Sequence, residues 1–193
     1  MKGSGMADAA GQELLKRAQG GDIAAFEELI MAERARLYSF ALGMAGGNHA
    51  DAADVLQESF VKAFLNIRRF RGDSSFGTWL WRIVRNEFLN YRKNLSTRSL
   101  ARDDGEAAHA APDTRDGAEE EIIAAERRAR LLEIVALLPP KYREVLVMID
   151  LREQGYEETV KMLDISMSAL KTRLMRAREK LSLLIRRRRS YFL

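Results

Sequence analysis

Apolar residues recur at every third or fourth position through most of the N-terminal half of the chain, which is the spacing of one face of an α-helix. The pattern predicts a helical stretch over 10–45, a second helix over 50–70 and a third over 78–93. Gly20-Gly21-Asp22 interrupts the first stretch, and the Asp22 side chain is suited to cap the helix that follows. Thr78 is the expected cap of the third helix, after a turn-rich loop.

The periodicity stops at residue 95 and resumes at residue 119. The intervening segment 95–118 is acidic and glycine-containing and has few large aliphatic side chains, which predicts a flexible linker. Beyond it the pattern predicts helices over 119–138, 141–153, 157–163 and 168–187. The short helix, tight turn and long helix near the C-terminus have the layout of a helix-turn-helix. We therefore predict an all-α fold with two small helical domains, 6–94 and 119–193, joined by the linker.

Composition excludes several classes of site. The 193 residues are 47% hydrophobic and include no cysteine, which excludes disulfides, thiolate metal sites and a cysteine nucleophile. Two histidines, sixty positions apart, make histidine-based catalysis or metal binding a poor starting hypothesis. No charge-free stretch approaches the ~20 residues of a membrane helix, so we expect a cytoplasmic protein without membrane insertion. The opening MKGSG, residues 1–5, looks like a remnant of cloning.

Charge is distributed unevenly along the chain. Residues 6–94 hold 12 basic and 11 acidic side chains, residues 95–125 hold 3 and 8, and residues 126–193 hold 16 and 9. A near-neutral first part and a strongly basic last part suggest two modules with different partners, and the basic one favours a polyanion such as nucleic acid.

The long C-terminal helix is the most informative feature. Leu170, Leu174 and Ala177 give it one apolar side, while Lys171 and Arg176 lie on the side that could enter a DNA major groove. A basic amphipathic helix can also be a solvated face or a membrane-surface helix. The absence of boundary aromatics before Tyr191 disfavours a membrane, so DNA binding is the preferred interpretation.

A second feature is an acidic stripe. Asp51, Asp54 and Glu58 are spaced so that they project from one helix face. Three carboxylates could hold a divalent metal, meet a basic protein surface, or complement the helix dipole. One helix without carboxylates from a second element makes a poor metal site, so a protein partner or the dipole is preferred to catalysis.

The third feature interleaves aromatic and basic side chains over 68–93. Rings suit unstacked bases and cations suit phosphates, so the pattern is typical of single-stranded nucleic-acid binding. Aromatics at helical spacing are more often core residues, and we expect at least half of the five to be buried. They are Phe70, Phe76, Trp79, Trp81 and Tyr91.

Together these features resemble a known family. The runs DAADVLQESF from Asp51 and FRGDSSFGTWLWRIVRNEFLNYRKN from Phe70 are similar to the σ2 domain of bacterial extracytoplasmic-function (ECF, group 4) sigma factors. The run from Leu138 to Leu181, which begins LPPKYREVLVMIDL, resembles their σ4 domain. In the turn of that domain Asp164 stands where relatives often have glycine, and aspartate tolerates the left-handed conformation better than most residues.

The resemblance implies an alternative sigma factor that binds core RNA polymerase and initiates transcription at specific promoters, without enzymatic activity or cofactor of its own. It implies docking on the largest-subunit clamp by Asp51, Asp54, Gln57 and Glu58, with a further contact to the polymerase flap. It implies −10 element binding by Lys62, Phe70, Ser74, Phe76, Arg82, Arg85 and Asn86. It implies −35 element binding by Ser168, Lys171, Thr172, Arg173, Met175, Arg176 and Arg178. An anti-sigma factor is the expected regulatory partner.

Two other functions are compatible with parts of the sequence. A dimeric helix-turn-helix regulator would explain the basic C-terminus but leaves the acidic stripe and the aromatic loop without a role. A metal-dependent nuclease using Asp51, Asp54 and Glu58 would need a second carboxylate-rich segment or a nearby histidine, and the sequence offers neither near that stripe.

Overall fold

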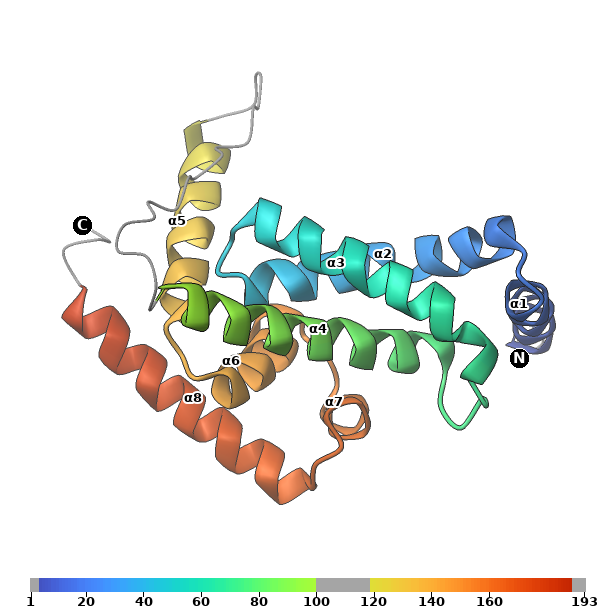
Figure 1. Cartoon of the computed structure of the whole chain (residues 1–193). Helices are drawn as coiled ribbons and strands as arrows, with labels where there is room; N and C mark the ends of the chain where they lie inside the picture. Colours follow the sequence, from blue (N-terminus) through green and yellow to red (C-terminus); the bar gives the residue numbers. More distant parts are fainter. Residues whose placement is uncertain (1–3, 100–118, 189–193) are drawn as a thin grey trace.

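The computed structural model describes residues 4–99 and 119–188, and every regular element within these ranges is a helix (Figure 1). Residues 100–118, most of the predicted linker, lie outside the described residues. The N-terminal half, residues 4–99, contains α1 (Ser4–Gln19), α2 (Ile23–Met44), α3 (His49–Asn66), the 3₁₀ turn η1 (Ile67–Arg69) and α4 (Phe76–Ser99). The all-α prediction is confirmed for the described residues.

The C-terminal half, residues 119–188, is built from shorter helices and one long one. It contains α5 (Glu119–Ala136), α6 (Pro140–Leu146), the π-helical turn η2 (Val147–Leu151), α7 (Tyr156–Leu163) and α8 (Met167–Arg187). α7, a three-residue turn and α8 form the predicted helix-turn-helix. Within the described residues no helix is both long enough and apolar enough to cross a membrane.

Local capping interactions set several helix boundaries. Asp22 caps α2 as predicted, since its Oδ1 accepts a hydrogen bond from the Ala25 amide at 3.1 Å. Thr78 does not cap α4. The Ser75 hydroxyl accepts from the Thr78 amide at 3.2 Å, so α4 begins two residues earlier than predicted. Asp164, which ends α7, takes the left-handed conformation at φ 54°, as expected for an aspartate in that turn.

α4 extends further than the sequence pattern indicates. It runs to Ser99, through five residues that were predicted to belong to the linker, because no glycine or proline follows Gly77 until residue 105. α1 likewise begins at Ser4, inside the segment interpreted as a remnant of cloning.

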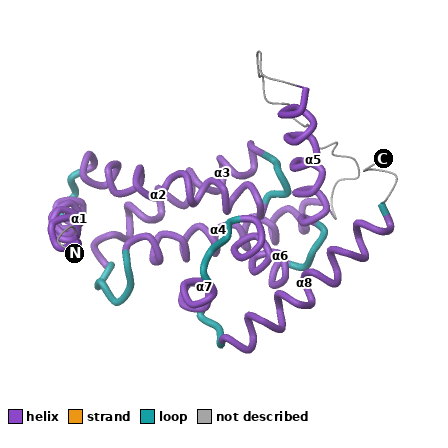
Figure 2. Tube along the Cα trace, turned by 180° about the vertical axis from the view of Figure 1, so that it is seen from behind, coloured by secondary structure: helices purple, strands orange, loops and turns teal. Residues whose placement is uncertain are grey.

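The helices pack in a layered arrangement around α4. Figures 1 and 2 show α4 between the α2–α3 pair on one side and α6, α7 and α8 on the other, while α1 crosses the far end of α2. One buried apolar cluster continues through both halves, and it includes Phe40 and Trp81 of the N-terminal half and Val147 and Leu170 of the C-terminal half. The two halves therefore share a core. We call this packing the closed arrangement.

α2 and η2 approach each other very closely at Gly43. A Cβ atom placed on Gly43 would lie 2.8 Å from Cγ1 of Val147, which is closer than two carbon atoms can pack. Only glycine leaves room for the Val147 side chain at this point, so Gly43 limits how closely the N-terminal half packs on the C-terminal half.

Candidate protein- and nucleic-acid-binding surfaces

The acidic stripe lies on the solvent-facing side of α3, apart from its first member. Asp54, Gln57 and Glu58 are exposed. Asp51 is half-buried, and its Oδ1 accepts a hydrogen bond of 2.7 Å from the Tyr91 hydroxyl of α4. Among the described residues no cluster of acidic and histidine side chains is arranged to hold a metal ion. α3 thus exposes two carboxylates and an amide, while the Asp51–Tyr91 hydrogen bond joins α3 to α4.

The exposed face of α3 continues into an apolar patch that sequence reasoning missed. Val61 and Leu65 are 55% and 72% exposed, and their spacing places them on the same helix face as Asp54 and Glu58. Apolar side chains left in water next to charged ones are typical of protein–protein contact surfaces. The spacing of these residues could have revealed the patch in the sequence, because positions 54, 58, 61 and 65 follow one helical stripe.

The aromatic loop forms a compact ring cluster at the start of α4. The rings of Phe70 and Phe76 meet edge to face with centroids 6.3 Å apart, and Trp79 lies 5.2 Å from Phe70 and 5.7 Å from Phe76. Phe70 and Trp81 are buried, while Phe76, Trp79 and Tyr91 are half-buried. Two of the five aromatics are thus buried, which is fewer than the predicted half.

The other residues assigned to the −10 element differ in accessibility. Ser74 is half-buried in the loop and Asn86 is exposed on α4. Lys62 of α3 forms an ion pair with Glu87, next to Asn86 in the chain. α3 and α4 pack against each other, and the Lys62–Glu87 ion pair joins them at the surface.

Arg82 and Arg85 point from α4 into the C-terminal half. Nη2 of Arg82 donates to the Lys161 carbonyl oxygen at 3.1 Å. Arg85 forms a two-pronged ion pair with Glu144 of α6, with its Nε 2.7 Å from Oε2 and its Nη2 3.2 Å from Oε1. The two arginines expected to meet DNA phosphates therefore bind protein groups in the closed arrangement.

α8 has the two-sided character predicted for a recognition helix. Leu170, Leu174 and Ala177 are buried against the rest of the C-terminal half. The Ser166 hydroxyl caps the helix by accepting from the Ala169 amide at 3.2 Å. The exposed residues of those assigned to the −35 element are Ser168, Lys171, Thr172, Met175, Arg176 and Arg178.

Four of the basic side chains on α8 have partners within the protein, and one of them, Lys180, places its Nζ 5.8 Å from the centroid of the Tyr142 ring. Nη1 of Arg173 lies 3.6 Å from Oε1 of Glu144, the carboxylate that also binds Arg85. Arg178 pairs with Asp150 through two contacts of 2.9 Å and 2.6 Å, and this hydrogen bonding raises the pKa of the guanidinium. A hydrogen bond from Arg176 lowers the pKa of Tyr142. Lys171 forms no ion pair among the described residues.

The two halves are also joined by a buried arginine that sequence reasoning did not single out. Arg143 is 1% exposed, and its Nη1 donates to the Met44 carbonyl oxygen at the end of α2 at 2.7 Å. Its Nη2 donates to the carbonyl oxygens of Ala136 and Leu138, the latter at 3.0 Å. Burial, with a smaller contribution from nearby Arg92, lowers the pKa of Arg143 to about 9.

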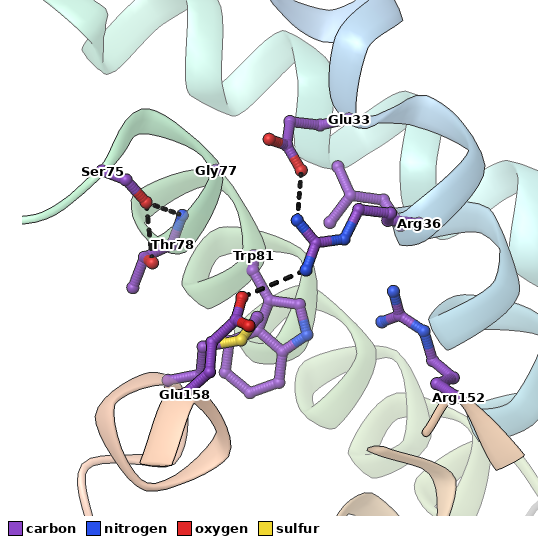
Figure 3. A pocket seen from close by; sticks show the side chains of 10 residues that line it. Glu33, Arg36, Ser75, Gly77, Thr78, Trp81, Arg152 and Glu158 are labelled. Carbon is purple, nitrogen blue, oxygen red and sulfur yellow. Dashed lines mark hydrogen bonds and ion pairs between the residues drawn. The ribbon is translucent and has the colours of Figure 1, made fainter. Parts of the chain in front are cut away.

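A narrow cleft remains between the halves (Figure 3). Nη2 of Arg36 on α2 reaches Glu158 of α7 at 3.1 Å, and the indole of Trp81 forms part of the wall. Burial lowers the pKa of Arg152 on the opposite wall, and the proximity of Arg36 lowers it further. The cleft is therefore lined by charged side chains of both signs and by the edge of an aromatic ring.

Known family models match each half of the chain. Residues 29–98 match the family model for Sigma-70 region 2, and residues 128–181 match the model for Sigma-70, region 4. The ECF RNA polymerase sigma-E factor of Haemophilus influenzae is 30% identical over 174 residues, covering 87% of this chain and 91% of that protein. The corresponding factor of Salmonella typhimurium is 33% identical over 175 residues, covering 87% and 90%.

Solved structures share the fold. CnrH, in complex with the cytosolic domain of CnrY, superimposes with a TM-score of 0.64 at 27% identity, over 91% of this chain and 97% of CnrH. The sigma factor RpoE of Bartonella quintana, in complex with the anti-sigma factor NepR, gives a TM-score of 0.63 at 22% identity, over 83% and 96%.

Proposed function

We propose that this chain, which belongs to the family of ECF RNA polymerase sigma factors, binds core RNA polymerase and directs it to promoters through their −10 and −35 elements. Sigma factors are not enzymes, and nucleotidyl transfer belongs to the polymerase. One observation carries the proposal. A single chain combines an exposed acidic face on α3 with a helix-turn-helix in α7 and α8, in the chain order of regions 2 and 4.

The N-terminal domain, proposed as 6–94, supplies the polymerase contact. Asp54, Gln57 and Glu58 are the residues we assign to the largest-subunit clamp, and their exposure supports this assignment. Asp51 contributes by positioning α3, since its carboxylate is bound to Tyr91. A second contact, between the C-terminal domain 119–193 and the polymerase flap, tethers the chain at two points, so that each contact can be weak alone.

The promoter contacts are proposed to follow the same division. The loop and α4 would meet the −10 strand through Lys62, Phe70, Ser74, Phe76, Arg82, Arg85 and Asn86. α8 would read the −35 element through Ser168, Lys171, Thr172, Arg173, Met175, Arg176 and Arg178. The exposed, unpaired Lys171 near the start of α8 supports this, because recognition helices contact base edges with their N-terminal residues.

Cellular context belongs to the same proposal. A factor that works on RNA polymerase acts in the cytoplasm. Because 95–99 of the predicted linker belong to α4, the linker is proposed to be 100–118. Control by an anti-sigma factor is implied by the family resemblance. CnrH, at 27% identity, is itself bound to the cytosolic domain of CnrY.

The two rival functions account for fewer features. A dimeric operator-binding regulator leaves the acidic and apolar face of α3 without a partner. It would be favoured by tight, operator-specific binding in the absence of polymerase. A nuclease would have to use Asp54 and Glu58 with an Asp51 that is already bound to Tyr91. Magnesium-dependent cleavage by the pure protein would be needed to support it.

The test is binding to core RNA polymerase followed by transcription from a promoter library. We expect the double variant Asp54→Lys/Glu58→Lys to lose polymerase binding and sigma-dependent starts. The matched control is Glu27→Lys/Glu28→Lys, which makes the same charge change at two exposed positions of α2. Equal loss in both variants, or no loss in the first, would refute the assignment of the α3 face.

A further inference from the structure

The cleft of Figure 3 contains a buried polar group that the described part of the chain leaves without a partner. Trp81 is 1% exposed, and its indole nitrogen Nε1 has no hydrogen-bond partner among the described residues. Such buried donors are rare in folded proteins, because they lose their bond to water and gain nothing in return. The ring is held in place by packing on Phe40, with centroids 5.1 Å apart. The donor therefore has a fixed direction, and Figure 3 shows it on the side of the ring that faces Arg152.

The opposite wall of the cleft supplies a guanidinium that is also unpaired. Arg152 is half-buried at the end of η2, and it forms no ion pair or hydrogen bond with another described side chain. Burial lowers the pKa of Arg152, and the charge of Arg36 lowers it further. The neighbouring carboxylates offset these effects only in part. A negative charge beside Arg152 would stabilise its charged form.

The two carboxylates of the cleft are bound to a different arginine. Nη2 of Arg36 lies 3.1 Å from Oε1 of Glu158, and Nη1 of Arg36 lies 3.9 Å from Oε2 of Glu33 (Figure 3). The same guanidinium donates to Oε1 of Gln154 at 3.2 Å. Arg36 is thus surrounded by acceptors, whereas neither carboxylate lies within ion-pair distance of Arg152.

The space and the free donors together define what the cleft can hold. Its volume is about 40 Å³, and one water molecule needs roughly 10–15 Å³ by this measure, so a planar group of three or four non-hydrogen atoms fits. The indole N–H and the guanidinium are donors only, so the ligand must supply acceptors. A carboxylate matches the guanidinium fork with its two oxygens. A water molecule would satisfy the indole but would leave the guanidinium charge uncompensated.

We propose that this cleft is a binding site for a short monocarboxylate of the size of formate or acetate, held by the Arg152 guanidinium and by Nε1 of Trp81. Buried Leu37 and Met162, which also line the cleft, provide an apolar surface for the methyl group of acetate. None of the lining residues is assigned to polymerase or to a promoter element, so the site is independent of the proposed function. Because Trp81 lies in α4 and Arg152 in the C-terminal half, the bound anion joins the two halves and stabilises the folded chain.

The two tryptophans of the chain make the site directly observable. In the full chain labelled with ¹⁵N at its indoles, Trp79 and Trp81 give two amide-type cross-peaks, and Trp79→Phe assigns them. Sodium acetate is titrated against sodium chloride at constant ionic strength. We expect the Trp81 cross-peak to move saturably, with a roughly millimolar dissociation constant. The Trp79 cross-peak should stay in place, because Trp79 does not line the cleft.

Substitutions identify the groups that bind. Arg152→Met removes the charge and the fork at similar length and should weaken acetate binding by about tenfold or more. The matched control is Arg128→Met at an exposed position of α5, which should bind acetate like the unmodified chain. Trp81→Phe keeps an aromatic ring and deletes the donor. Acetate, compared with chloride, should raise the melting temperature of the unmodified chain more than that of Trp81→Phe.

Three results would overturn the proposal. One is a Trp81 cross-peak that does not move saturably when acetate replaces chloride. Another is undiminished acetate binding by an Arg152→Met chain that circular dichroism shows to be folded. The third is benzoate binding as tightly as acetate, because the ring of benzoate exceeds the volume of the cleft. If Arg152→Met does not fold, the titration of the unmodified chain and the melting of Trp81→Phe still decide the question.

Discussion

Replacing Arg143 by methionine tests what holds the two halves together. Arg143 is a fully buried cation, and no carboxylate forms an ion pair with it among the described residues. Its guanidinium binds only carbonyl oxygens, which belong to Met44 at the end of α2, Ala136 at the end of α5 and Leu138 in the turn that follows. Methionine has a similar length and fills most of the same space without charge or donors. The substitution therefore removes the polar contacts while leaving the packing largely intact.

The expected effect is a balance between two opposing contributions. Hydrogen bonds from a charged donor contribute about 1.5–3 kcal/mol each, and three would be lost, leaving three buried carbonyls without this partner. Removing the cation also relieves its desolvation. The lowering of the Arg143 pKa to about 9 places this relief at roughly 4–5 kcal/mol at most. Three such bonds amount to about 4.5–9 kcal/mol, so subtracting the relief leaves an expected fall in the free energy of unfolding of about 0–5 kcal/mol, centred near 2 kcal/mol.

Urea unfolding followed by circular dichroism measures this change. The matched control is Arg128→Met at an exposed position of α5, which should change the free energy of unfolding by less than about 0.5 kcal/mol. A loss below about 1 kcal/mol for Arg143→Met would show that the buried guanidinium contributes little net stability. The account of how α6 is anchored to α2 would then be wrong.

Three further expectations concern caps and charge. Hydrogen bonds from the Ala25 amide and from Arg17 lower the pKa of Asp22, so the folded carboxylate binds protons less readily than the unfolded one. Its stabilising contribution is present above the unfolded pKa of 3.8 and is lost as pH falls through the lower folded value. The melting temperature should fall over this pH range, and Asp22→Asn should abolish that dependence on pH. Ser166→Ala should lower the stability of the C-terminal half by about 1 kcal/mol in urea unfolding, since it deletes the cap of α8. Lys171→Ala should lower the affinity for a −35 duplex by about 1–3 kcal/mol while changing the affinity for a scrambled duplex much less in promoter-fragment titrations, as expected for one lost base contact.

Features that depend on neighbours in the chain could be predicted from the sequence. The cap at Asp22 requires only a side-chain oxygen three residues before an amide. The buried face of α8 requires only the spacing of Leu170, Leu174 and Ala177, which the structure confirms as buried. The start of α4 was missed because Ser75 and Thr78 are both competent caps. The choice of Ser75 depends on the path of the loop before it.

Features that depend on contacts between distant segments could not be predicted. Arg85 and Glu144 are 59 residues apart, and nothing in either local pattern indicates a partner. Arg143 lies in a run of charged residues that looks solvated, yet its side chain is buried because the end of α2 and the segment between α5 and α6 converge on it with unpaired carbonyls. The same limitation applies to Gly43, whose role follows from Val147 on the other side of the interface.

The face proposed for polymerase docking lies apart from the interface between the two halves. Asp54, Glu58, Val61 and Leu65 are exposed on α3, whereas the arginines of α4 and α8 at the interface bind protein groups. The closed arrangement therefore leaves the α3 face accessible to a partner protein while it occupies Arg82, Arg85 and Arg173.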